Sequence, residues 1–369
     1  MLDSMPSYQR FSEREFFGSL NGLRAIAALL VVWHHCHQGI DFGRIGSRMG
    51  HVGVSLFFVL SGFLIVTLLI RERRKTADID LRAFYGRRAL RIMPLYYAIV
   101  ILTAVFVLGF HSSSSEAEAL RAGLPYLLTY TTNWVPVVSF LAISWTLATE
   151  EQFYLFWPQI QKRVADSIWV PGVLLVLSEA IRFRLLDPVF HVLGWDVAKA
   201  PFLLIGGFTP ILLGVLLAYA LNSPTGFRRC ARVFGYRFAP LVVVVILILA
   251  LLLLPGGWAS FRTAQDALVN LTLYVLLTLV IGATVIREDH ALARGLSIRW
   301  VSWLGVISYG IYLLHLPVNL FVDFVLPDLS PVVRLLTITA FTVLAADLSY
   351  RFFERPFLQM KEKFGIARV

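Results

Sequence analysis

The chain has 369 residues, of which 58% are hydrophobic and 15% are charged, and its mean hydropathy is +0.73. Soluble domains are about half apolar and about a quarter charged, so this composition excludes a single water-soluble core and indicates a protein that lies in lipid. Two cysteines are too few for a disulfide framework, and the net charge of +10 has to be interpreted from where the basic residues lie.

The polar first nineteen residues lack the basic start, short apolar stretch and cleavage site of a secretory signal peptide, so we expect no cleaved leader. A membrane-crossing helix needs about 20 mostly apolar residues. The apolar segments predict about ten such helices, at 20–38, 51–70, 92–110, 140–160, 168–186, 202–221, 239–254, 264–286, 300–325 and 332–350. The stretch around 126–134 fits a short interfacial helix better than a span.

The expected fold class is therefore all-α, a polytopic membrane helical bundle. Residues 20–350 form its transmembrane domain, between a cytoplasmic N-terminal segment at 1–19 and a cytoplasmic tail at 351–369. The distribution of basic residues favours this topology, because cytoplasmic loops of membrane proteins carry an excess of Lys and Arg. The segments expected inside hold 24 of the 33 basic residues. The net positive charge is thus mainly a topology signal, and nucleic-acid binding is not expected.

The first predicted span carries Arg24, His34 and His35. Arg24 and His35 are eleven residues apart, so they lie within about 20° on one helix face and roughly 16 Å apart along the axis. Ionisable groups inside a span are costly and are functional candidates by default. This stripe is expected to face the protein interior, although Arg24 reaching the membrane surface and His35 at the interface remain alternatives. His34 points about 100° away and is expected to have a structural or interfacial role.

The fourth predicted span contains Glu150 and Glu151 near its middle, where a carboxylate needs a partner or a proton. One candidate partner is His35, which would give a carboxylate–imidazole pair able to orient a general base. A structural ion pair or an amphipathic interfacial stretch, rich in Trp and Tyr such as Trp145, is the alternative.

The ninth predicted span places His315 at a depth similar to that of His35, with Tyr312 one turn below it. These side chains either line one cavity or make polar contacts between helices. Asp347, in the tenth span, lies at the right depth to pair with Arg24. Ser61 is a weak candidate nucleophile, because its neighbour Gly62 indicates close helix packing instead.

A basic segment between the second and third spans contains Arg87, Arg88 and Arg91. Arg88 and Arg91 are three residues apart and share a helix face. Guanidinium groups bind phosphate bidentately, so the cluster could hold the phosphates of a nucleotide-like donor. Positive-inside topology or anionic lipid would also place arginines here, and from these residues alone that explanation is favoured. The sequence shows no metal-ligand spacing and no Gly-rich phosphate loop.

Several stretches together resemble one known family. They are, in chain order, LNGLRAIAALLVVWHH, GVSLFFVLSGFLI, FYGRRALRIMPLYY, SWTLATEEQFYLFWP, SYGIYLLHLPV and FFERPF. The sequence resembles the acyltransferase-3 family of bacterial membrane proteins, which includes O-antigen and exopolysaccharide O-acetylases and macrolide acylases. It departs from the family pattern at Asn21 and Ser55, where an Asp is usual or frequent.

The resemblance implies an O-acyltransferase of the bacterial inner membrane. Its donor substrate would be cytoplasmic acyl-CoA, most simply acetyl-CoA, and its acceptor a hydroxyl of a glycan, glycolipid or related molecule. No permanently bound cofactor is implied. His35 would be the essential base or acyl carrier, and Glu150 would support the site. Arg24, Arg88 and Arg91 would bind the donor. Some relatives carry a further C-terminal domain, whereas this chain would act alone.

On this hypothesis the donor's phosphates dock on Arg87, Arg88 and Arg91, and its pantetheine arm enters along the stripe that bears Arg24. His35 then removes the acceptor's hydroxyl proton, or takes the acyl group first. A transporter or flippase that exports a glycan is the rival, although such proteins usually show an internal repeat, which we do not see. A structural or sensory protein would leave the buried His and Glu unexplained.

Overall fold

The structure, a computed structural model, describes residues 6–41, 43–110, 113–134, 141–164, 167–194, 207–255 and 263–361. These ranges form helices and contain no strand, which confirms the all-α fold class for the described part of the chain. The helices are α1 (Tyr8–Glu13), α2 (Gly18–Cys36), α3 (Gly43–Gly46), α4 (Met49–Thr76), α5 (Leu81–Phe110), α6 (Ser115–Leu128), α7 (Ser144–Val164), α8 (Trp169–Arg182), α9 (Asp187–Val192), α10 (Phe208–Leu221), α11 (Pro224–Phe234), α12 (Ala239–Leu253), α13 (Ala264–Ile286), α14 (Ala293–Leu296), α15 (Arg299–Val306), α16 (Ser308–Val325), α17 (Pro331–Leu348), the π-helix η4 (Ser349–Glu354) and α18 (Arg355–Gln359).

Among the described residues, five helices are long and apolar enough to cross a membrane. They are α4, α5, α13, α16 and the continuous run from α17 through α18. The pair α10 and α11 also passes this test when taken together, but it is bent by 104°. The chain is thus a multi-pass membrane protein by the length and composition of its helices. The count of ten spans stays a prediction, and the expected spans at 140–160 and 202–221 begin outside the described residues.

One helix expected from the sequence is divided in the structure. Residues 300–325 were expected as one helix, but the helix is interrupted at Ile307, between α15 and α16. The apolar pattern is continuous across residues 300–325, so it does not reveal this break. Helix α15 packs on the start of α2. There Gly305 lies against the backbone of Asn21, and a Cβ on Gly305 would lie 2.0 Å from the Asn21 carbonyl oxygen. Only glycine allows this approach, which fixes α15 on α2 before the chain restarts as α16.

The basic segment expected as a loop before the third span is helical. Helix α4 continues to Thr76, a turn containing Ala77 at φ +64° follows, and α5 begins at Leu81. Arg87, Arg88 and Arg91 therefore lie on α5, where helix geometry rather than loop flexibility sets their directions. Beyond α17, the chain continues through η4 and α18, which pack against the same helix α5.

The centre of the bundle is the contact between α4 and α10. An added Cβ on Gly62 would lie 2.1 Å from the carbonyl oxygen of Ile211, and one on Gly214 would lie 2.2 Å from that of Val59. Two glycines therefore let the two backbones touch, as in other close helix pairs of membrane proteins. The prediction that Gly62 marks close packing is confirmed.

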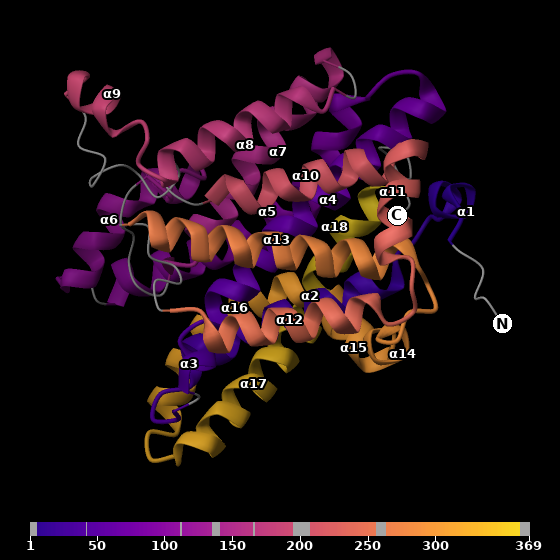
Figure 1. Cartoon of the computed structure of the whole chain (residues 1–369). Coiled ribbons are helices and arrows are strands. Elements are labelled where there is room, and N and C mark those ends of the chain that lie inside the picture. Colours follow the sequence, from indigo (N-terminus) through magenta and orange to yellow (C-terminus); the bar gives the residue numbers. More distant parts are fainter. Residues whose placement is uncertain are drawn as a thin grey trace.

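Segments expected on the inner side gather at one end of the bundle. Arg71, at the end of α4, donates to the carbonyl of Phe11 (3.0 Å), and Arg14 donates to that of Val285 at the end of α13 (2.7 Å). Lys162, at the end of α7, joins the same end through its ion pair with the chain just beyond α4. Helices α3, α6 and α9 lie at the opposite end (Figure 1). The bundle thus has one basic end, as the charge pattern predicted.

Candidate active site

Two neighbouring cavities inside the bundle contain the residues singled out from sequence. We call the first the arginine cavity; it is lined by Arg24, Arg88, Arg91 and Glu150, among others, and holds about 70 Å³ of space. We call the second the histidine cavity; it contains His35 and holds about 400 Å³. Helix α2 contributes to both, because Arg24 lies near its start and His35 near its end.

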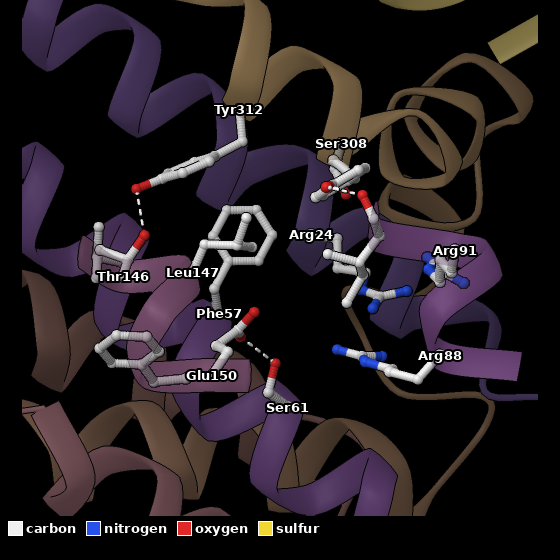
Figure 2. A pocket seen from close by; sticks show the side chains of 14 residues that line it. Arg24, Phe57, Ser61, Arg88, Arg91, Thr146, Leu147, Glu150, Ser308 and Tyr312 are labelled. Carbon is white, nitrogen blue, oxygen red and sulfur yellow. Dashed lines mark hydrogen bonds between the residues drawn. The ribbon is translucent and has the colours of Figure 1, made fainter. Parts of the chain in front are cut away.

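The charged side chains of the arginine cavity come from three helices. Arg24 comes from α2, Arg88 and Arg91 from α5, and Glu150 from α7 (Figure 2). Three guanidinium groups face one carboxylate, so the lining carries an excess of positive charge. Arg88 lies over the ring of Tyr154, with its Cζ atom 3.6 Å from the ring centre, and this cation–π contact holds the side chain in place. The cavity is suited to an anionic group such as a phosphate.

Glu150 accepts a hydrogen bond from the Ser61 hydroxyl on α4 (Figure 2). It faces the guanidinium groups of Arg24 and Arg88, and it lies on the wall of the arginine cavity, not of the histidine cavity. The pairing of Glu150 with His35 considered from sequence is therefore not formed. The sequence placed both groups in the membrane interior. In the structure Glu150 lies beside the Arg24 end of α2, and His35 lies about three helical turns away along α2.

Arg87 and Asp347 also differ from expectation. Arg87 pairs with Glu72 at 3.3 Å and lines a third cavity, of about 1060 Å³, at the basic end of the bundle. It is thus separated from Arg88 and Arg91. Asp347 does not pair with Arg24; it accepts from Trp303 Nε1 (2.9 Å) and pairs with Arg351 (2.8 Å) one turn later on the same helical run. A local partner was available, so the longer-range pair is not made.

The histidine cavity has several aromatic and imidazole side chains in its lining. His34, His51 and Tyr274 lie on its wall together with His35, and Trp145 packs its ring edge-on against Phe58. Further wall residues include Ser55, Tyr312 and Ile143. His34 was expected to have a structural or interfacial role, yet it lines this cavity. Ser55, one of the two departures from the family pattern, lies here as well.

His35 and His315 are in direct contact. His315 Nε2 lies 3.2 Å from His35 Nδ1. His35 Nδ1 also lies 3.0 Å from the carbonyl oxygen of Val31, and His315 Nδ1 lies 2.7 Å from that of Tyr312. A carbonyl oxygen can only accept, so each Nδ1 carries a hydrogen and donates it. His315 Nε2 then carries a lone pair, and His35 shares its single Nδ1 hydrogen between this atom and the Val31 carbonyl, which leaves the lone pair of His35 on Nε2. The sequence left two alternatives open, a shared cavity or a polar contact between helices. The structure shows the polar contact, and His315 is fully buried.

The two cavities adjoin at a partition. Four residues line both of them: Val54, Phe58, Thr146 and Tyr312. The hydroxyl groups of Thr146 and Tyr312 lie 2.6 Å apart, and Figure 2 shows them meeting across the end of the arginine cavity. Sequence reasoning noted Tyr312 but missed Thr146. The signal was present, because Thr146 is one helical turn before Glu150 and so shares its face.

In the described ranges, no group of three or more His, Cys, Asp or Glu side chains is placed to hold a metal ion. The polar site is instead made of guanidinium, imidazole, carboxylate and hydroxyl groups buried between helices. A helical bundle with such a site in its interior defines a polytopic membrane protein that binds or converts a polar substrate within the membrane.

Residues 17–351 match the acyltransferase domain of the acyltransferase-3 family, and the chain belongs to this family. Similar proteins include the peptidoglycan O-acetyltransferase OatA of Listeria monocytogenes, which is 28% identical over 93% of this chain and 56% of its own length. A putative O-acetyltransferase of Staphylococcus aureus is 28% identical over 96% of the chain and 59% of its own length. The putative peptidoglycan O-acetyltransferase YrhL of Bacillus subtilis is 27% identical over 95% and 56%. The chain thus spans less than three fifths of the length of these relatives. No solved structure shows significant similarity to it.

Proposed function

We propose that this protein is a membrane-bound O-acyltransferase that moves an acyl group, most simply acetyl, from cytoplasmic acyl-CoA to a hydroxyl of a glycan or related acceptor. The observation that carries the proposal is the juxtaposition of two sites in one bundle. An arginine-lined cavity, suited to an anionic donor, adjoins a cavity in which His35 presents the lone pair of Nε2. Family membership favours this reading over a transporter.

The donor is assigned to the basic end of the bundle. Arg88 and Arg91 offer guanidinium groups to its phosphates, and Arg24 continues the positive lining toward His35. Arg87 contributes from the separate third cavity, whose volume of about 1060 Å³ suits the nucleotide part better than the 70 Å³ of the arginine cavity. On this proposal the basic end faces the cytoplasm and the protein lies in the inner membrane.

The acceptor is assigned to the histidine cavity. Its volume of about 400 Å³ is within the range of small-ligand sites, and its aromatic walls, Trp145 and Tyr274, suit the apolar face of a sugar ring. Three of the similar proteins are named as O-acetyltransferases, two of them acting on peptidoglycan, which makes a cell-wall sugar hydroxyl one candidate acceptor.

In the proposed reaction, His35 Nε2 takes the proton of the acceptor hydroxyl while its oxygen attacks the thioester carbonyl carbon. The new C–O bond forms, the C–S bond breaks, and the sulfur leaves as a thiolate that receives the proton from the imidazolium. A two-step variant transfers the acyl group to Nε2 first and to the hydroxyl second. His315 holds the reactive tautomer in both versions, and Glu150 holds the positions of Arg24 and Arg88.

The test is to incubate purified protein in lipid vesicles with acetyl-labelled acetyl-CoA and defined glycans, and to analyse the glycans by mass spectrometry. The proposal predicts an acetyl mass increment on the acceptor that depends on the protein. Movement of unmodified glycan across the vesicle membrane, with no mass change, would instead identify a transporter.

A further inference from the structure

The partition between the two cavities, which we call the ring, is made of four residues from three helices. Val54 and Phe58 come from α4, Thr146 from α7 and Tyr312 from α16, and all four line both cavities. The contact between the Thr146 and Tyr312 hydroxyls closes the ring at 2.6 Å. Both side chains are buried, so this contact is made inside the bundle and not at its surface.

The hydroxyl pair is held in register by one carbonyl group. Thr146 Oγ1 lies 2.9 Å from the carbonyl oxygen of Ile143, and the Tyr312 hydroxyl lies 3.3 Å from the same atom. Each hydroxyl has one hydrogen, so two hydrogens serve the three contacts: one hydroxyl donates to the Ile143 carbonyl and the other donates to its hydroxyl neighbour. Phe57 meets the Tyr312 ring edge-on, at 6.0 Å between ring centres. The groups in contact are therefore uncharged, and a substrate that passes between them does not have to break an ion pair.

Any acyl group that travels from the arginine cavity to Nε2 of His35 by way of the adjoining walls has to pass this ring. Building on the proposed function, we propose that Thr146 and Tyr312, with Val54 and Phe58, form the filter that selects the size of the acyl group. A hydrophobic pocket that encloses a substrate discriminates one methylene by roughly 10- to 200-fold, and the same steric argument applies to the ring. The arginine cavity, at about 70 Å³, leaves little space for a long chain before the ring is reached. The ring therefore selects short acyl groups such as acetyl.

The experiment compares kcat/KM for acetyl-, propionyl- and butyryl-CoA with one acceptor, in wild type and in variants reconstituted in vesicles. Thr146→Ala removes a methyl and a hydroxyl from the ring, and it should raise the butyryl-to-acetyl ratio by about 10-fold or more. Thr146→Val removes the hydroxyl but keeps the size, so its ratio should stay within about 3-fold of wild type even if its kcat changes. Comparing these two variants separates the effect of the ring's width on the ratio from the effect of the Thr146 hydrogen bond.

Val54→Ala widens the ring from another helix and should shift the ratio in the same direction as Thr146→Ala, so the test survives if one variant fails to fold. Thr339→Val is the matched control. Its hydroxyl also bonds to a helix carbonyl, that of Leu335 at 2.7 Å, but it lies on α17 away from both cavities. It should leave both rate and ratio unchanged.

Wild-type ratios in both widening variants, together with normal acetyl transfer, would overturn the filter and leave the proposed function standing. A shift caused equally by Thr146→Val would also overturn it, because the hydroxyl and not the width would then set the selectivity. Absence of transfer from every donor in the wild type is a different result, which contradicts the proposed function itself.

Discussion

His35 shares its Nδ1 hydrogen between the Val31 carbonyl and His315, whose Nε2 lies 3.2 Å away, and this contact links the end of α2 to the middle of α16. His315 can accept because its own Nδ1–H is already used on the Tyr312 carbonyl. The backbones of two helices thus set both tautomers before any substrate arrives. The nitrogen left for chemistry on His35 is Nε2, so His315 is a positioning residue in the proposed reaction.

Replacing His315 tests this role. His315→Leu removes the acceptor and should lower kcat by about 10-fold or more, which is part of the roughly 10²- to 10⁴-fold contribution of a well-placed general base. The donor KM should change little, because His315 lies outside the arginine cavity. His315→Gln can place an amide oxygen near the lost nitrogen and should recover part of kcat. Equal losses in both variants, in step with their thermal stabilities, would indicate a purely structural residue.

Arg88 is expected to bind the donor. Arg88→Ala should raise the donor KM by about 10- to 100-fold, since a hydrogen bond to a charged group is worth about 1.5–3 kcal/mol. Arg88→Lys should recover only part of this, because an ammonium lacks the guanidinium fork. Arg229→Ala is the control, since Arg229 is an exposed arginine on α11 at the same end of the bundle. An unchanged donor KM in Arg88→Ala removes Arg88 from the donor site.

Lys361, beyond α18, gives the donor site a pH dependence. Burial, reinforced by the nearby Arg91 and Arg88, lowers the pKa of Lys361 to about 7. Lys361 is therefore mostly charged at pH 6 and mostly neutral at pH 8. An anionic donor favours the charged form, so its KM should rise as the pH increases through 7. The donor's own phosphate ionises with a pKa near 6 and acts in the opposite direction.

Lys361→Arg isolates the contribution of this lysine, because the arginine stays charged throughout the range. Steady-state kinetics from pH 6 to 8 should show a smaller rise in donor KM for the variant than for wild type. Parallel pH profiles for the two proteins would exclude Lys361 from the donor site.

The α4–α10 contact should be intolerant of added volume. Gly62→Ala places a methyl 2.1 Å from the Ile211 carbonyl oxygen, so the helices must separate. Overpacking of this kind costs about 1–3 kcal/mol. Gly109→Ala is the control, since no heavy atom lies within 4 Å of its added methyl. Thermal unfolding in detergent should show a lower midpoint for Gly62→Ala alone, and equal midpoints would contradict the packing account.

Much of the fold and part of the site could be predicted from sequence. Apolar segments indicated the long helices. The cost of burying charge singled out Arg24 and Glu150, and the basic cluster singled out Arg88 and Arg91; these four residues do share a cavity. Periodicity gives the face on which a residue lies but not which helix packs against that face. The contact of Glu150 with Ser61 therefore could not be predicted.

Two further features could not be predicted, because sequence periodicity does not show which helices pack together. The ring closed by Thr146 and Tyr312 joins α7 and α16, which are far apart in the chain. The break at Ile307 has no proline or glycine at that position, and the nearby contact of Gly305 with α2 joins segments that are far apart in the chain.

The central claim is that Nε2 of His35 performs the acyl transfer. The most direct measurement is transfer of labelled acetyl from acetyl-CoA to a glycan by His35→Ala, compared with wild type and with His191→Ala, which alters an exposed histidine on α9. The account predicts that His35→Ala loses transfer by about 10²-fold or more while it still inserts into membranes and keeps its thermal stability. Transfer at the wild-type rate by His35→Ala would contradict the account.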